Sequence, residues 1–201
     1  MIKGSKICGI SDLNTLDFII NHSYPPKFIG FITNYPKSKR YIEYENLKNL
    51  INIDKKKINF VSVLVNPNDE TLEKINDLNF DYYQLYDVDP NRTMKIKDKY
   101  KTKIISALTI SNKKDVSKYK YYSEISEIIL FDSKGYHKSE SFDHSLLDEV
   151  PNELNKMIAG NIQINDIPNL KNKDYIIDLS GSIENNEGKK DLNKIDKLLN
   201  L

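Results

Sequence analysis

Eight short apolar runs, rich in Ile, Val and Phe, recur along the chain and constrain its fold more than any other feature. Between them lie segments with helical spacing or helix-capping residues. Continuous apolar strands that alternate with helices are typical of an α/β protein with a buried parallel sheet. The runs predicted to be strands are 5–10, 28–33, 59–65, 82–86, 103–110, 127–131, 157–159 and 175–179. Eight such units predict a closed (β/α)8 (TIM) barrel.

The intervening segments carry helix starts. Ser11 or Asp12 can cap a first helix. Asn66-Pro67-Asn68-Asp69 offers an N-cap, a proline at the first helical position and an acidic first turn. Asp89-Pro90 repeats this start. The pattern therefore places helices directly after the first, third and fourth strands.

The competing fold is an open, doubly wound sheet, but no Gly-rich dinucleotide fingerprint follows the first strand. The barrel would be compact, with about 25 residues per unit, since roughly 250 residues are typical of the class. No Pro- or Gly-rich linker divides the chain, so we expect one domain over residues 1–201. The weakest matches to the pattern are Pro25-Pro26, which ends the first helix early, and residues 161–172, which leave room for only a short helix.

The charges nearly cancel, with 30 Lys and Arg residues against 29 Asp and Glu residues and no long block of one sign. This balance gives no electrostatic footprint for nucleic acid or an acidic membrane. A single cysteine, Cys8, cannot form an internal disulfide or a Cys-rich zinc site. The chain starts without a signal peptide, and no apolar run approaches the roughly 20 residues that cross a bilayer. We therefore expect a soluble, cytoplasmic protein that binds neither nucleic acid nor a membrane.

Functional residues of a (β/α)8 barrel stand where the strands end and in the loops that follow. Cys8 ends the first apolar run, and Asp132 follows the sixth. The loop after the second run, residues 34–41, is basic and contains Arg40, whose guanidinium could hold a carboxylate. The last two strands end in residues whose N–H groups can approach an anion: Gly160, Asn161, Ser180, Gly181 and Ser182.

Each of these features also has a purely structural explanation. Cys8 could be a nucleophile, a base or a buried small hydrophobe, because free Cys is among the most buried residue types. The basic loop could simply be solvated, Asp132 could cap a helix, and Gly160 and Gly181 could serve tight turns. Their joint placement on one predicted rim favours a functional site.

Two stretches are specific enough to indicate a family, Lys6-Ile7-Cys8-Gly9-Ile10 and Tyr35-Pro36-Lys37-Ser38-Lys39-Arg40-Tyr41. Weaker matches stand at 30–32, 63–66, 84–85, 131–134, 142–143, 158–160 and 178–191. On these residues, nearly from end to end, the chain resembles the phosphoribosylanthranilate isomerases, (β/α)8 enzymes of tryptophan biosynthesis.

The resemblance implies an Amadori rearrangement of N-(5-phosphoribosyl)anthranilate to 1-(2-carboxyphenylamino)-1-deoxyribulose 5-phosphate, with no metal or organic cofactor. By the matching motifs, Asp132 would be the general acid that opens the furanose ring, and Cys8 the general base that removes the C2 proton. Arg40 would face the anthranilate carboxylate, and Asp178 would help to hold the opened sugar. The residues that would cradle the phosphate are Gly160, Asn161, Ser180, Gly181 and Ser182.

The chain also departs from the family pattern. The usual Gln-Leu-His-Gly after the fourth strand reads Gln84-Leu85-Tyr86-Asp87, and residues 135–141 replace a Gly-rich loop after the sixth. A paired glycine at the seventh strand has become Gly160-Asn161, and Ser-Ser-Gly-Val-Glu after the eighth reads Ser180-Gly181-Ser182-Ile183-Glu184. These departures motivate an alternative, a diverged non-catalytic barrel that binds a sugar phosphate or a protein partner.

The chemistry of Cys8 disfavours two further functional hypotheses. A sister reaction in histidine biosynthesis shares the barrel and the Amadori chemistry but uses two aspartates, which a cysteine in the base position disfavours. A redox role lacks a resolving thiol. As a base near neutral pH, a thiol of ordinary pKa, about 8.5, would need only a modest lowering of that pKa. We expect a small-molecule substrate and, since family members occur in both states, a monomer or a homodimer.

Overall fold

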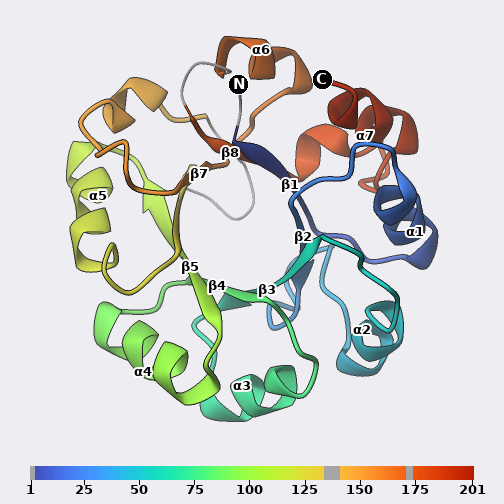
Figure 1. Ribbon diagram of the computed structural model, residues 1–201, viewed down its shortest axis with the longest axis horizontal. Helices are drawn as coiled ribbons and strands as arrows, with labels where there is room; N and C mark the ends of the chain where they lie inside the picture. Colours follow the sequence, from blue (N-terminus) through green and yellow to red (C-terminus); the bar gives the residue numbers. More distant parts are fainter. Residues whose placement is uncertain (1–2, 134–140, 171–173) are drawn as a thin grey trace.

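The computed structural model describes residues 3–133, 141–170 and 174–201, and its strands form a closed parallel barrel (Figure 1). The strands follow one another around the ring in chain order, and β1 pairs with β8 to close it. The predicted (β/α)8 barrel is therefore confirmed. The strands are β1 (Gly4–Cys8), β2 (Phe28–Ile32), β3 (Asn59–Val65), β4 (Tyr82–Tyr86), β5 (Lys103–Ile110), β6 (Ile128–Ser133), β7 (Lys156–Ile158) and β8 (Ile176–Leu179).

Helices surround the ring of strands (Figure 1). They are α1 (Leu13–Asn21), α2 (Tyr44–Leu50), α3 (Asp69–Asn76), α4 (Pro90–Tyr100), α5 (Lys113–Ser117), α6 (Ile167–Leu170) and α7 (Leu192–Leu199). Short 3-10 helices stand at Lys118–Tyr121, His144–Leu147, Ile164–Asp166 and Gly181–Ile183. The first and last helices, α1 and α7, pack side by side, so the outer ring closes where the strands close.

The sixth strand is longer than its apolar run. Asp132 and Ser133 pair with Thr109 and Ile110 of β5, so β6 continues two residues beyond the predicted end. Their polar side chains look like the start of a loop, but the strand pairing with β5 includes them. No helix begins at Asp132 in the described residues, because Asp132 and Ser133 both belong to β6. The interpretation of Asp132 as a helix cap is therefore wrong. Strand pairing instead holds this carboxylate at the rim of the barrel.

The helix starts follow local capping chemistry. Asp12 caps α1, and Asp89 caps α4 with Pro90 at its first position, as predicted. α3 differs, because Asn68 is its N-cap and Pro67 precedes the helix instead of occupying its first position. The Asn68 side chain binds a backbone N–H of the first turn, which fixes this later start. The helical segments after β1 and β7 are short, as expected, since α1 ends before the two prolines and α6 has four residues.

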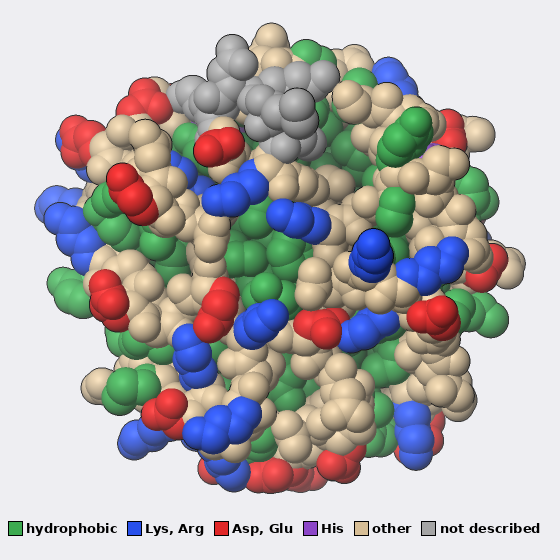
Figure 2. Space-filling view, viewed as in Figure 1, with side chains coloured by type: hydrophobic (Ala, Val, Ile, Leu, Met, Phe, Trp, Pro, Cys, Tyr) green, Lys and Arg blue, Asp and Glu red, His purple; other side chains and the backbone are tan. Residues whose placement is uncertain are grey.

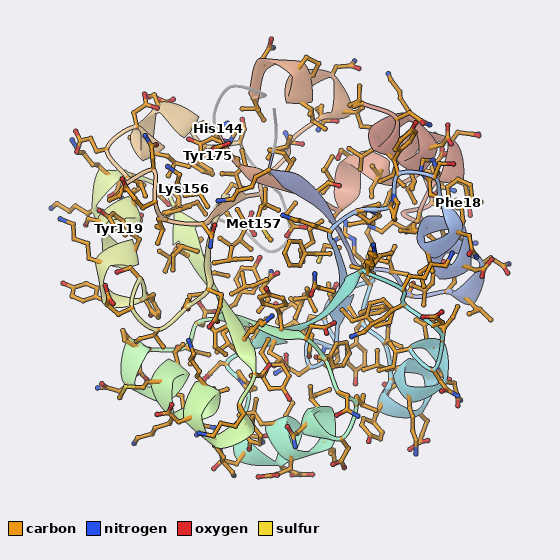
Figure 3. The ribbon with its side chains drawn as sticks, in the orientation of Figure 1. Phe18, Tyr119, His144, Lys156, Met157 and Tyr175 are labelled. Carbon is orange, nitrogen blue, oxygen red and sulfur yellow. The ribbon has the colours of Figure 1, made fainter. Side chains whose placement is uncertain are left out.

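Side chains alternate between the inside of the barrel and the surrounding helices. On β7, Met157 points into the ring, whereas Lys156 points outward beside Tyr175 (Figure 3). The inner apolar cluster comprises Cys8, Phe28, Val61, Val63, Tyr86, Ile105, Ala107, Ile128, Leu130, Met157, Ala159 and Ile176. The larger apolar core lies between strands and helices and contains residues such as Ile7, Phe31 and Ile129. Inward-facing polar residues, among them Gln84 and Asp178, are therefore confined within the ring.

The surface seen down the barrel axis carries Lys and Arg side chains interspersed with Asp and Glu side chains (Figure 2). Hydrophobic side chains are visible near its centre (Figure 2). Within the described part of the chain, none of the helices has the length and apolar character needed to span a bilayer.

Candidate active site

A cavity of about 220 Å³ opens where the strands end. Its lining comes from the ends of strands β1 to β6 and β8 and from the loops that follow β2, β7 and β8. It includes every residue that the sequence predicted for the site: Cys8, Arg40, Asp132, Gly160, Asn161, Asp178, Ser180, Gly181 and Ser182. The structure thus brings the whole predicted set around one space.

Cys8 stands next to a buried lysine of its own strand. Because side chains alternate along a strand, Lys6 and Cys8 both face the inside of the barrel. Lys6 is fully buried, and its Nζ donates to Oδ2 of Asp178 at 2.8 Å. Lys6 and Asp178 are direct neighbours in the pairing of β1 with β8. Gly30 of β2 leaves room for this arrangement, since a Cβ there would lie 3.0 Å from both Cys8 Sγ and Lys6 Nζ.

Burial and charge act in opposite directions on these groups. Burial raises the pKa of Cys8, and the ammonium of Lys6 offsets only part of that rise. The site therefore does not lower the pKa of Cys8, as a base near neutral pH would require, because the thiol is almost fully enclosed. Burial opposes the charge of Lys6 as well, but the Asp178 carboxylate and Cys8 together outweigh it and raise the lysine pKa. Lys6 therefore keeps a permanent positive charge beside the thiol.

Asp178 lines the cavity and has one carboxylate oxygen without a hydrogen-bond partner among the described residues. Its Oδ2 accepts from Lys6, whereas its Oδ1 is buried and has no hydrogen-bond partner among the described residues. A buried acceptor left without a donor costs about 1–3 kcal/mol, so a ligand hydroxyl at this position would be favoured. The arrangement suits the binding of a polyhydroxylated molecule.

Asp132 faces the same cavity from β6 and is bound to a tyrosine. The hydroxyl of Tyr86, the last residue of β4, donates to Oδ2 of Asp132 at 2.9 Å. Burial raises the pKa of Asp132 to about 6, against the opposing effect of the Tyr86 hydrogen bond. The carboxyl can therefore gain and lose a proton close to neutral pH, which is the property of a general acid.

Arg40, in the loop after β2, forms a fork with Glu184, which follows β8. Its Nε and Nη2 donate to the two carboxylate oxygens of Glu184 at 2.5 and 3.0 Å. Lys190 donates to the same carboxylate at 3.0 Å and to the carbonyl oxygen of Ser180 at 3.0 Å. Burial opposes ionisation of Glu184, but the hydrogen bonds from Arg40 and Lys190 lower its pKa to about 2. Nη1 of Arg40 makes no hydrogen bond to a described residue and remains available to a second carboxylate.

Gly160 and Asn161, which follow β7 after Ala159, share left-handed backbone, with φ of +96° and +52°. A Cβ on Gly160 would lie 2.5 Å from Oγ of Ser133, so this position requires glycine. Asparagine is one of the few other residues that adopt left-handed backbone readily, which explains how Asn161 replaces a glycine. Neither N–H donates a hydrogen bond to another residue in the described part of the chain. Both can therefore point donors at an anion.

Sequence reasoning missed three charged partners of the predicted residues: Lys6, Glu184 and Lys190. A signal existed for Lys6, because a lysine inside an apolar strand, two residues before Cys8, must share the inward face with it. The partnership of Glu184 with Arg40 joins residues 144 positions apart and has no local signal. The altered loop 135–141 lies outside the described residues except for Ser141. Among the described residues, no group of three or more His, Cys, Asp or Glu side chains is placed to hold a metal ion.

Comparison with known proteins gives a consistent result. The family model for N-(5'-phosphoribosyl)anthranilate (PRA) isomerase matches residues 5–201. An N-(5'-phosphoribosyl)anthranilate isomerase of Rhizobium rhizogenes is 30% identical, over 96% of this chain and 90% of the relative. A crystal structure of phosphoribosylanthranilate isomerase in complex with reduced 1-(o-carboxyphenylamino)-1-deoxyribulose 5-phosphate superposes with a TM-score of 0.84 at 25% identity, over 99% of this chain and 97% of the other. Monomers generated from the dimeric enzyme of Thermotoga maritima give the same TM-score, identity and coverage.

Proposed function

The chain belongs to the family of N-(5'-phosphoribosyl)anthranilate isomerases, and from this premise we propose that it catalyses the Amadori rearrangement of N-(5-phosphoribosyl)anthranilate to 1-(2-carboxyphenylamino)-1-deoxyribulose 5-phosphate. One observation carries the proposal: a thiol from β1 and a carboxyl from β6 line the same cavity. The reaction needs an acid at the ring oxygen and a base at C2, two atoms that are both bonded to C1 of the same sugar.

Asp132 acts as the general acid in this scheme. It protonates the furanose ring oxygen while the C1–O bond breaks, and the anthranilate nitrogen supplies the electron pair that forms the protonated Schiff base. A carboxyl whose pKa is about 6 is still partly protonated near neutral pH and donates readily. An ordinary aspartate, with a pKa of about 3.9, would be almost entirely ionised there.

Cys8 acts as the general base. It removes the C2 proton, and the electrons of that C–H bond form the C1=C2 bond of an enolamine, which tautomerises to the ketone. Burial raises the pKa of Cys8, so the thiolate is less populated but more basic. The charge of Lys6 offsets part of this rise, so some thiolate can still form. The cationic Schiff base also favours the thiolate by direct electrostatic attraction, so a larger fraction of Cys8 is ionised once the Schiff base has formed.

The remaining residues bind the two anionic ends and the sugar. Arg40 faces the anthranilate carboxylate through the N–H groups that Glu184 leaves available. Asp178 accepts from a sugar hydroxyl through Oδ1. The N–H groups near the ends of β7 and β8 cradle the phosphate, with contributions from Gly160, Asn161, Ser180, Gly181 and Ser182.

The test is the loss of anthranilate fluorescence when purified protein is added to phosphoribosylanthranilate generated in situ. We expect rapid loss with the wild-type chain and a fall in kcat of roughly 10² to 10⁴ in each of Cys8→Ser and Asp132→Asn. Asp81→Asn is the matched control, because Asp81 precedes β4 at the other end of the barrel and binds Lys55. It should keep near-normal turnover.

Near-normal turnover in Cys8→Ser or Asp132→Asn would remove that residue from its role. No fluorescence loss from folded wild-type protein would refute the proposed reaction. The altered loops would then outweigh the retained acid and base, and the non-catalytic barrel would be tested next by sugar-phosphate binding.

A further inference from the structure

A hydrogen-bonded chain crosses the inside of the barrel to Asp132. Gln84 and Tyr86 lie two residues apart on β4, so both side chains face inward. Tyr86 pairs with Ala107 of β5, and Asp132 lies one strand further, on β6. The small side chain of Ala107 leaves the phenol room to pass over β5. The Tyr86 hydroxyl reaches Oδ2 of Asp132 at 2.9 Å.

The donors in this chain run in one direction. Nε2 of Gln84 donates to the phenol oxygen of Tyr86 at 3.2 Å, and the phenol donates in turn to Asp132. Tyr86 keeps its proton, because burial, and then the nearby Asp132 charge, raise the phenol pKa well above its ordinary value. Oδ2 of Asp132 is thus an acceptor, and the acidic proton of the protonated carboxyl is left to Oδ1.

Other groups also face Asp132. Asp178 on β8 favours its protonated form, whereas Lys6 on β1 and the backbone N–H of Ser133 favour the carboxylate. The neighbouring strand β5 contributes Thr109, which is uncharged. Within this set the Tyr86 hydroxyl is the side chain that binds Asp132 directly.

We propose that Tyr86 is a positioning residue for Asp132: its hydroxyl occupies Oδ2 and so orients the carboxyl to donate its proton from Oδ1. This inference rests on the proposed role of Asp132 as general acid. Gln84 supports this arrangement, because its hydrogen bond to the phenol oxygen fixes the orientation of the Tyr86 hydroxyl.

Tyr86→Phe tests the inference, because it removes the hydroxyl and keeps the ring. Two quantities are measured: the ionisation of Asp132 by carboxyl carbon NMR without substrate, assigned against Asp132→Asn, and kcat and KM as functions of pH. Loss of a hydrogen bond to the charged form should raise the pKa of Asp132 by about one unit. We expect kcat to fall roughly tenfold at little change in KM, and the Asp132 inflection in the pH profile to move upward by the same amount.

Tyr83→Phe is the matched control. Tyr83 is also buried on β4, but it belongs to the cluster between strands and helices and faces away from the site. It should leave the pKa of Asp132 and kcat unchanged.

An unchanged pKa of Asp132 in Tyr86→Phe would overturn the inference, even if kcat fell, because the hydroxyl would then act only on packing. An unchanged kcat would overturn it as well. Absence of activity in the wild-type chain would refute the proposed reaction separately, and the substrate-free titration would still decide whether Tyr86 controls Asp132.

Discussion

Replacing Lys6 by methionine tests the electrostatic origin of the proposed base. Methionine is unbranched, flexible and uncharged, so Lys6→Met removes the ammonium while it fills much of the same space. Cys8 is the single cysteine of the chain, and all thiol chemistry of the protein therefore reports on this one group. Because Lys6 lowers the pKa of Cys8, its removal must raise that pKa.

The size of the effect follows from the geometry around Gly30. A Cβ at Gly30 would lie 3.0 Å from Cys8 Sγ and 3.0 Å from Lys6 Nζ, so these two atoms are separated by no more than twice that distance. Opposite unit charges about 6 Å apart, at an effective dielectric constant of about 20, attract by roughly 3 kcal/mol, or about two pKa units. We therefore expect the pKa of Cys8 in Lys6→Met to lie about two units above the wild-type value.

The assay is the rate of iodoacetamide alkylation, followed by mass spectrometry across the pH range in which thiols ionise. Cys8 lines the cavity, so a small reagent has access to it. Lys6→Met leaves Asp178 buried without its partner, which costs about 3–5 kcal/mol of unfolding free energy, so urea unfolding must first show that the variant is folded. The double variant Lys6→Met/Asp178→Asn removes both charges and should show a smaller rise, since Asp178 acts on Cys8 in the opposite direction.

A folded Lys6→Met protein whose alkylation midpoint moves by less than about half a pKa unit would refute the argument. The lysine would then serve only to neutralise Asp178. A larger shift in the double variant than in the single one would refute it too, because it would reverse the signs of the two charges.

Three further outcomes are expected. Gly160→Ala places a Cβ 2.5 Å from Oγ of Ser133 at a φ of +96°, so the unfolding free energy should fall by about 1–3 kcal/mol; an unchanged urea midpoint would contradict this close approach. Glu184→Gln keeps the shape of the side chain but removes the charge that holds Arg40 and Lys190, so KM should rise roughly tenfold. That rise should be constant across neutral pH because the pKa of Glu184 is about 2, and an unchanged KM would show that the fork does not orient Arg40. Inorganic phosphate should raise KM at constant kcat, and indifference of the enzyme to it would argue against the phosphate cradle.

The fold was predictable because each strand is buried on both faces. Strands such as β3 and β5 consist mostly of apolar and β-branched residues, and their observed bounds match the prediction. β6 shows the limit of this reasoning. Its last two residues are polar because they face the site and a neighbouring loop, and only pairing with β5 reveals them as strand. Local composition therefore does not predict the end of a strand where its last residues belong to the functional site.

The site was predictable as a set of positions but not as a network. Strand order places Cys8, Asp132 and Gly160 on one rim once a barrel is assumed. The pairing of Lys6 with Asp178 depends on the register between the first and last strands, which no local pattern specifies. The contact of Tyr86 with Asp132 depends likewise on the order and register of β4, β5 and β6. Interactions of this kind require the three-dimensional arrangement.

The ion pair of Lys6 and Asp178 joins positions 172 residues apart and spans the seam where the ring closes. During synthesis Lys6 emerges with β1, whereas its partner Asp178 is made only with β8. Enclosing it earlier would leave a buried charge without compensation, which is strongly unfavourable. Closure of the ring and completion of the environment of the thiol are therefore one event. A fragment that ends before β8 should therefore lack both the ion pair and the complete environment of the thiol.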